Sequence, residues 1–161
     1  MMRITGITTF IMESPGREYL FVKVQTDDGI YGWGEGTLEM KQGTVAAAIR
    51  DLQGFIIGED PTRIDYLWQR MYRHGFWRGG EAILTAVSAI EMALWDVAGK
   101  AANLPVHKLL GGKVRDRVRV YNGNVRFPLR DQSPAAYAEN MQKMKESPEG
   151  FTIIKQGVGY H

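Results

Sequence analysis

The longest stretch of helical periodicity runs from Ile83 to Ala102. Apolar residues recur in it at spacings of three and four, as one face of a helix requires. They are Ile83, Val87, Ile90, Leu94, Val97 and Ala101. Asp96 and Lys100 form an i,i+4 pair with the acid before the base. Gly99 is locally unfavourable by ~1 kcal/mol relative to Ala, and close packing of another backbone would explain it. The stretch is therefore predicted to be a helix with one apolar stripe.

An antiparallel sheet is predicted nearer the N-terminus. Residues 3–12 favour a strand, and residues 19–26 alternate apolar and polar as a half-buried strand does. Asp27–Gly29 is a hairpin turn signal, after which residues 30–36 return as a third strand. These segments predict a three-stranded antiparallel meander.

Further helices are predicted between the sheet and the long helix, and just beyond it. One spans Thr44–Ile57, and a second spans residues 60–75 with Pro61 near its first turn. A short helix starts at Pro105. Residues 1–112 are therefore predicted to form one α+β domain.

The pattern changes in the last third of the chain. Val118–Asn124 favours a strand that runs into a polar loop, and Ser133 with Pro134 is a typical helix start. Phe151–Ile154 then favours a strand without polar alternation, as in a buried parallel sheet. Residues 113–161 are therefore predicted to be the opening β-α-β of an α/β domain.

Composition and charge exclude several classes of function. The chain has 161 residues, 44% of them hydrophobic, and a net charge of +2, so no overall field attracts nucleic acid or an anionic membrane. Cys is absent, which excludes disulfides and thiolate metal sites. No apolar run approaches the ~20 residues of a membrane helix, and the N-terminus lacks the features of a signal peptide. We expect a cytoplasmic protein that binds neither nucleic acid nor membrane.

The short motifs give little chemistry by themselves. Gly32 and Gly34 fit the first two glycines of a dinucleotide fingerprint, but Thr37 stands where the third glycine is required. The three His residues are scattered and form no ligand pair. Trp77 lies in a segment flanked by glycines, next to Arg78. Two interpretations remain open: a packed Trp beside a surface Arg, or an aromatic and cationic wall around an anionic polar ligand.

A family resemblance is carried by "AVSAIEMALWDVAGKAANLPVHKLLGG", residues 86–112. This stretch resembles the signature helix of the mandelate racemase/muconate lactonizing branch of the enolase superfamily. The matching positions are Ala86, Ser88, Ala89, Glu91, Ala93, Asp96, Gly99, Lys100, Pro105, Val106, Leu109, Leu110 and Gly111. The resemblance extends through "DDGIYGWGE", "IGEDPTRIDYLWQRMYR" and "VRVY" and covers essentially the whole chain.

The resemblance implies a fold and a chemistry. In this family an N-terminal α+β domain caps a modified (β/α)-barrel, which holds Mg²⁺ on carboxylates and removes a proton next to a substrate carboxylate. The metal neutralises the charge of the enediolate, and a Lys or His takes the proton. Catalytic groups of such barrels stand at the C-terminal ends of strands. Lys155 follows the strand predicted at 151–154, so we expect it to hold or polarise the substrate carboxylate.

Two stretches, "SPGREY" and "FWRGG", look most like the sugar-acid dehydratases of the mannonate and galactonate kind. By that resemblance, the loops Glu13–Glu18 and Gly36–Lys41 cap the active site and read the far end of the substrate. The residues expected to bind the substrate are Arg17, Glu39, Trp77 and Arg78.

The sequence also departs from the family pattern. Racemases and epimerases of the family carry Lys-x-Lys at the end of this strand, whereas here Lys155 is followed by Gln156 and Gly157. Because Gly has no side chain to accept a proton, racemisation by paired bases is disfavoured. We expect a Mg²⁺-dependent acid-sugar dehydratase. The alternatives are a racemase, epimerase or cycloisomerase of the same superfamily, and a family member that binds a ligand without catalysis.

A complete barrel takes ~250 residues, far more than residues 114–161 supply. We therefore expect the 161 residues to be the front part of a longer chain with an incomplete barrel. No metal ligand is expected within them, because the family's ligands would lie beyond His161. The resemblance also implies a homo-oligomer, a dimer or an octamer.

Overall fold

The structure is a computed structural model that describes residues 1–123 and 127–157. The chain divides into two compact units, Met1–Lys113 and Val114–His161, and each is described here by itself. Asn124, the last residue of one predicted strand, and the terminal His161 lie outside the described residues.

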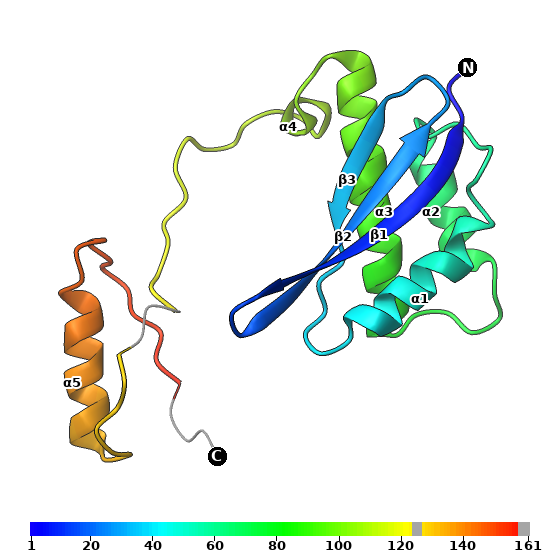
Figure 1. Cartoon of the computed structure of the whole chain (residues 1–161). Coiled ribbons are helices and arrows are strands. Elements are labelled where there is room, and N and C mark those ends of the chain that lie inside the picture. The colour runs from blue at the N-terminus through cyan, green and yellow to red at the C-terminus, as the bar shows by residue number, and fades with distance from the viewer. Residues whose placement is uncertain (124–126, 158–161) are drawn as a thin grey trace. The chain divides into compact units, whose positions relative to one another are not determined.

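The first unit begins with the predicted meander. Strands β1 (Ile4–Ser14), β2 (Arg17–Thr26) and β3 (Tyr31–Glu35) are antiparallel and lie in the order β1-β2-β3 (Figure 1). The alternation predicted for the middle strand is confirmed, since Leu20 and Val22 are fully buried and the residues between them are not. The sheet therefore has one buried face.

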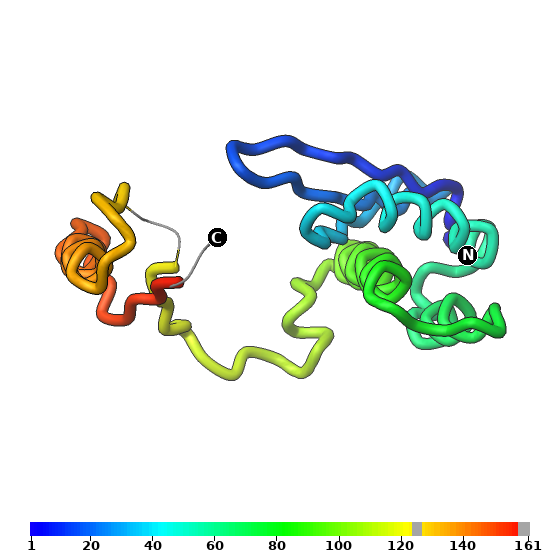
Figure 2. The backbone as a smooth tube through the Cα atoms, turned by 90° about the horizontal axis from the view of Figure 1, so that it is seen from below, coloured from blue at the N-terminus to red at the C-terminus, as the bar shows by residue number. Residues whose placement is uncertain are grey.

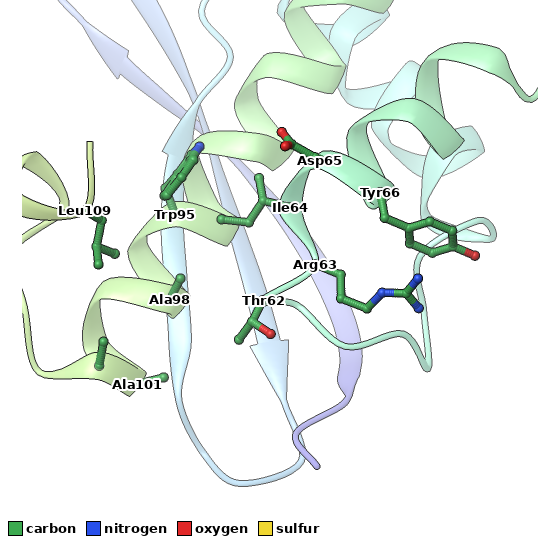
Figure 3. Close-up of a pocket in the computed structure, with 10 residues that line it drawn as sticks. Thr62, Arg63, Ile64, Asp65, Tyr66, Trp95, Ala98, Ala101 and Leu109 are labelled. Carbon is green, nitrogen blue, oxygen red and sulfur yellow. The ribbon is translucent and has the colours of Figure 1, made fainter. Parts of the chain in front are cut away.

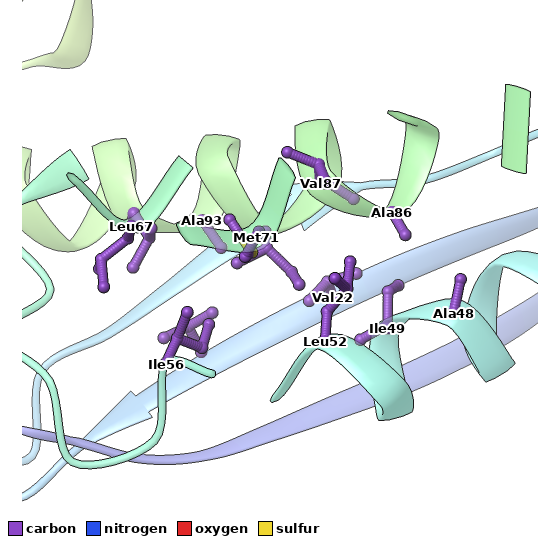
Figure 4. Close-up of a cluster of buried hydrophobic side chains, with 14 of the residues drawn as sticks. Val22, Ala48, Ile49, Leu52, Ile56, Leu67, Met71, Ala86, Val87 and Ala93 are labelled. Atoms are coloured by element: carbon purple, nitrogen blue, oxygen red, sulfur yellow. The ribbon is translucent and has the colours of Figure 1, made fainter. Parts of the chain in front are cut away.

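Four helices follow the sheet: α1 (Gln42–Gln53), α2 (Ile64–Arg73), α3 (Glu81–Ala102) and the short α4 (Val106–Leu109). The three longer ones lie on the same side of the sheet (Figure 2). Their apolar side chains and the buried sheet face make a single core (Figure 4). The largest fully buried side chains in this unit are Ile4, Leu20, Ile49, Leu52, Ile56, Leu67, Met71, Ile90 and Leu94. The α+β fold class predicted for residues 1–112 is confirmed.

The helix boundaries that differ most from the prediction are the end of α1 and the start of α2. Helix α1 ends at Gln53 instead of Ile57, because the next residues form turns in which Ile57 N donates to Gln53 O at 3.0 Å. Helix α2 begins at Ile64, so Pro61 precedes it. The carboxylate of Asp60 accepts hydrogen bonds from the Thr62 N–H at 2.9 Å and the Thr62 hydroxyl at 2.7 Å. This local turn competes with the first turn of a helix.

Helix α3 packs directly on β3 through glycine. A Cβ built on Gly32 would stand 2.0 Å from Ala93 O, and one on Gly34 would stand 2.0 Å from Ala89 O. Only residues without a Cβ permit this approach. The close backbone packing expected at Gly99 is also present, because a Cβ there would meet Leu104 O at 2.8 Å.

The predicted acid–base pair on α3 also joins the helix to the sheet. Asp96 Oδ2 accepts hydrogen bonds from Trp33 N at 2.9 Å and from Lys100 Nζ at 2.8 Å. Lys100 Nζ donates in turn to Tyr31 O at 2.7 Å. The pair therefore satisfies backbone groups of β3 as well as stabilising α3.

Among the described residues, α3 is the one helix whose length of 22 residues and apolar composition could cross a membrane. Glu91, Asp96 and Lys100 interrupt its apolar residues, so the sequence shows no continuous apolar run of that length. In the structure its apolar face is packed in the core of the first unit, where Ala89, Ile90 and the other core residues of α3 are buried. We therefore interpret α3 as a core helix.

The second unit contains helix α5 (Pro134–Lys145), which starts as predicted. The Ser133 hydroxyl accepts a hydrogen bond from Ala136 N at 3.2 Å, and Pro134 occupies the first turn. In the part of these flanking segments that the structure describes, the predicted strands pair at one parallel bridge, between Asn122 and Ile154. Val120 is 61% exposed, so this pair lacks the covered faces on which parallel strands depend. The pairing is nevertheless parallel, as a β-α-β unit requires.

Candidate substrate-binding site

The first predicted capping loop, Glu13–Glu18, is a paired hairpin and not an open loop. Ser14 pairs with Arg17 and Glu13 with Glu18, so the ladder continues to the turn. The turn itself is Pro15-Gly16, and Gly16 has a φ of +75°. Pro followed by Gly in the left-handed region is typical of a type II turn. The hairpin tip is therefore a defined structural element.

The second predicted capping loop, segment 36–41, is fastened to the base of this hairpin. Gly36 N donates to Leu20 O at 2.8 Å, and Leu20 N donates to the Thr37 hydroxyl at 3.2 Å. One residue further on, Gln42 Nε2 donates to Glu18 O at 3.0 Å. Three hydrogen bonds therefore join two segments that are distant in the sequence.

A pocket of about 370 Å³ lies where the two segments meet, and we call it the hairpin pocket. Its lining residues are Glu13, Ser14, Gly16, Arg17, Glu18, Met40 and Gln42. The guanidinium of Arg17 lies 3.9 Å from the Glu39 carboxylate and 5.2 Å from the centroid of the Tyr19 ring. Both side chains of this ion pair are largely exposed, so the pair is weak and can exchange for ligand contacts.

Of the four predicted substrate-binding residues, the structure thus brings Arg17 and Glu39 together. Met40 lies within the predicted capping loop Gly36–Lys41 without being singled out there, and Gln42 follows that loop directly. Met40 has a left-handed φ of +59°, which a residue other than glycine rarely adopts. The contact of Gln42 joins residues 24 positions apart. Neither feature has a signature in a single sequence.

Trp77 and Arg78 lie between α2 and α3 and belong to the same unit. Trp77 is 88% exposed, so it is not packed against the other described residues of this unit. Its ring makes an edge contact with Phe76 at 5.2 Å, and Arg78 Nε donates to Gly75 O at 3.4 Å. Among the described residues, no hydrogen bond or ion pair links this segment to Arg17. The segment presents aromatic surface and a cation to solvent.

Lys155 lies immediately after the parallel bridge of the second unit. Its backbone N–H donates to Asn122 O at 2.8 Å, which fixes the start of the exit segment. The side chain is exposed, and its ammonium lies 5.7 Å from the centroid of the Tyr121 ring. The Lys155 amine is therefore accessible at the end of the paired segment.

The next residue, Gln156, is held by a buried amide on α5. Asn140 is 4% exposed and donates from Nδ2 to Gln156 Oε1 at 3.1 Å, while its Oδ1 accepts from Phe127 N at 3.1 Å. Neighbouring side chains of an extended segment point to opposite sides. The contact of Gln156 with α5 therefore directs Lys155 away from that helix.

The described residues contain no group of three or more His, Asp or Glu side chains that could hold a metal ion. The residues at hand therefore do not form the carboxylate site that Mg²⁺ requires.

A larger pocket of about 650 Å³ is lined by the start of α2, the C-terminal half of α3 and the end of α4 (Figure 3). Ile64, Trp95 and Leu109 give it an apolar wall, and Trp95 Nε1 already donates to Glu91. None of the predicted site residues lines it. Its apolar wall is unsuited to a polyhydroxylated acid, which needs several hydrogen-bonding groups.

Comparison with known families identifies the family to which this domain belongs. The sequence model of the mandelate racemase/muconate lactonizing enzyme N-terminal domain matches residues 7–111. The chain belongs to this family. The match spans the meander, the hairpin pocket and the helices packed on the sheet, so the first unit is the N-terminal domain that this family shares.

Curated relatives within the family are sugar-acid dehydratases by name. A D-galactonate dehydratase from Xanthomonas campestris pv. campestris (strain B100) is 49% identical over 120 residues, which are 74% of this chain and 31% of the relative. A D-galactonate dehydratase from Ralstonia pickettii (strain 12J) is 49% identical over 121 residues, 75% of this chain and 31% of the relative. The chain thus spans less than a third of the length of these relatives.

Solved structures of the enolase superfamily resemble the chain over nearly all of its length. An enolase from Pantoea ananatis with bound D-gluconate and Mg has a TM-score of 0.82 at 34% identity and covers 98% of this chain and 37% of its own. A member of the enolase superfamily from Salmonella Typhimurium has a TM-score of 0.85 at 32% identity, with coverages of 96% and 42%. The predicted membership of the enolase superfamily is confirmed.

Proposed function

We propose that this chain is the N-terminal part of a Mg²⁺-dependent acid-sugar dehydratase. The observation that carries the proposal is the 49% identity to D-galactonate dehydratases over 120 residues. In the proposed protein, residues 1–112 form the capping domain, residues 113–161 begin the barrel, and later barrel strands supply the metal ligands. The name of the Pantoea ananatis structure, with bound D-gluconate and Mg, supports the same class of ligand and cation.

The proposed reaction removes one molecule of water. A base takes the proton α to the carboxylate, the electrons form an enediolate, and the β-hydroxyl departs with a proton from a general acid. The resulting enol becomes a 2-keto-3-deoxy acid. Mg²⁺, when bound, would neutralise charge on the enediolate oxygens.

Within this reaction we assign Lys155 to the substrate carboxylate. Its exposed ammonium follows the end of a paired barrel segment, where catalytic groups of barrels stand. A cation there stabilises the carboxylate as charge builds up on it. We do not assign Lys155 as the base of a racemase pair, because Gly157 replaces the second Lys of that pattern.

We assign the far end of the substrate to the N-terminal domain. Arg17 and Glu39 offer a cation and a carboxylate beside the hairpin pocket, which suits the hydroxyl groups of a sugar acid. Trp77 and Arg78 would add an aromatic face and a second cation. We further expect a cytoplasmic homo-oligomer, a dimer or an octamer.

The test is an assay of the whole protein with Mg²⁺ and a panel of aldonic and aldaric acids, including D-galactonate and D-gluconate. We expect a 2-keto-3-deoxy product from at least one of them. Exchange of the α-proton with inversion and without loss of water would instead indicate a racemase or epimerase. Binding of a sugar acid without either reaction would indicate a non-catalytic family member.

A further inference from the structure

Gln42 is a buried polar residue next to an exposed structural element. Its side chain is 5% exposed, although it stands at the very start of α1. Its Nε2 donates to the backbone oxygen of Glu18 at 3.0 Å, across 24 positions of the chain. Buried amides need such partners, because an unsatisfied one costs ~1–3 kcal/mol. The contact is therefore a fixed feature of the fold and not a chance surface bond.

The bond does not serve helix α1 itself. A capping side chain accepts hydrogen bonds from the free N–H groups of the first turn, whereas the Gln42 amide donates to another element. The residue before it, Lys41, makes no side-chain cap bond either. The side chain of Gln42 therefore connects two elements instead of ending one.

The hairpin tip has few other attachments. Most side chains from Phe10 to Glu18 are exposed, so little apolar packing fixes the tip. The β1–β2 ladder holds the two strands together, but an isolated two-stranded ribbon twists readily and is only marginally stable. The other two bonds to segment 36–41 are made by Leu20, nearer the base. The Gln42–Glu18 bond is thus the outermost of the three ties.

The strained turn before α1 serves the same arrangement. Met40 adopts a φ of +59° and is 92% exposed, while Gln42, two residues later, is buried. Left-handed backbone costs ~1–2 kcal/mol at such a residue and persists where surrounding contacts fix it. Both residues line the hairpin pocket. The turn therefore presents Met40 at the rim of the pocket and Gln42 at its interior.

We propose that Gln42 is a positioning residue: its amide fixes the hairpin tip against the start of α1 and so holds the hairpin pocket in one shape. That this shape sets the affinity for the far end of a sugar acid rests on the proposed function. Gln42 acts through the backbone of Glu18, which brings Arg17 and Glu13 to the pocket.

Two variants of nearly unchanged size test the proposal in the whole protein. Gln42→Met removes the donor, and Gln42→Glu replaces it with an acceptor that faces the Glu18 oxygen. Gln53→Met is the matched control, the same substitution at the other end of α1. The readouts are hydrogen exchange of the backbone amides of residues 17–20, the KM and kcat for the best sugar acid, and the Tm.

We expect exchange in the hairpin to accelerate about five- to tenfold in both Gln42 variants, as one lost hydrogen bond predicts. KM should rise about tenfold while kcat changes less than threefold, and the control should match the wild type. If Gln42 has a purely structural role, the variants should have a lower Tm, and KM and kcat should change to a similar extent. That result would overturn the proposal.

Exchange requires no substrate, so it decides the positioning role even in a protein that dehydrates no sugar acid. Unchanged exchange at residues 17–20 in both variants would contradict the proposal. If the wild-type protein shows no dehydratase activity but both Gln42 variants exchange faster than it does, the positioning role is supported and only the proposed function is contradicted.

Discussion

Gly34 and Ala89 stand so close that a Cβ on Gly34 would lie 2.0 Å from the Ala89 carbonyl oxygen. The backbone of β3 therefore rests directly on the backbone of α3. This contact holds β3 against α3, and the β1–β2 hairpin is joined to β3 through the sheet. The hairpin pocket depends on that placement, since segment 36–41 begins only one residue after β3 ends.

The Gly34→Ala variant should be strongly destabilised. The added methyl group meets backbone atoms that cannot rotate away, and overpacking of this kind costs about 1–3 kcal/mol or more. Gly43→Ala is the control, because a Cβ at this helical position meets nothing within 4 Å and should stabilise α1 by about 0.5–1 kcal/mol. Urea unfolding of both variants measures the difference, and equal stabilities would show that the contact is not so tight.

Asp60 should contribute a pH-dependent part of the stability. The hydroxyl and backbone N–H of Thr62 donate to its carboxylate and lower its pKa below the usual value of 3.8. A lowered folded-state pKa stabilises the fold above pH 3.8, and this stabilisation is lost as the pH falls through the folded-state pKa. Asp60→Asn should therefore lose less stability than the wild type between pH 5 and about pH 2.

Denaturant unfolding at several pH values checks this prediction. A curve for Asp60→Asn that runs parallel to the wild type over the whole range would show that the Thr62 bonds contribute nothing.

Asn140→Leu should disturb the exit segment of the second unit. The substitution leaves Phe127 N and Gln156 Oε1 without the amide that they share, at a cost of about 1–3 kcal/mol. If Gln156 directs Lys155, kcat/KM for a sugar acid should fall as well. Gln142→Leu, on the exposed side of the same helix, is the control. Wild-type activity in a folded Asn140→Leu protein would show that the hydrogen bonds of Asn140 do not orient Lys155.

Lys155→Met should lower kcat/KM for a sugar acid by about 10- to 100-fold, the value of one hydrogen bond to a charged group. Stability should hardly change, because the ammonium is exposed and its contact with Tyr121, at 5.7 Å from the ring centroid, is distant. Lys145→Met, at the end of α5, is a suitable control for the loss of a surface charge. Unchanged kinetics in the Lys155→Met protein would show that Lys155 does not bind the substrate carboxylate.

The periodic parts of the fold could be predicted from the sequence. The apolar stripe on α3 and the alternation around Val22 depend on local spacing, and both elements form as expected. The stripe is buried from Val87 to Val97, whereas Ile83 and Ala101 at its two ends are exposed. The start of α2 was misplaced, because Pro61 fits a first helical turn equally well and only the Asp60–Thr62 bonds favour a turn there.

The candidate site was harder to predict. Arg17 and Glu39 were identified through family resemblance, and their proximity depends on a hairpin whose length follows from strand pairing. The roles of Gln42 and Met40 could not be predicted from the sequence. The hydrogen bond of Gln42 to the hairpin and the left-handed φ of Met40 arise only when the hairpin and the turn before α1 pack together. Among the described residues, the parallel strands predicted around Asn122 pair at one bridge. A sequence can favour a strand without showing whether neighbouring elements cover that strand.

The most direct test of the account is the reaction of the whole protein with D-galactonate and Mg²⁺, followed by proton NMR in D₂O. The account predicts loss of water and a 2-keto-3-deoxy product that carries deuterium at C3, where the enol takes up a solvent deuteron. An α-proton that exchanges with solvent while the hydroxyl at C3 stays in place, here and with the other sugar acids of the panel, would contradict it.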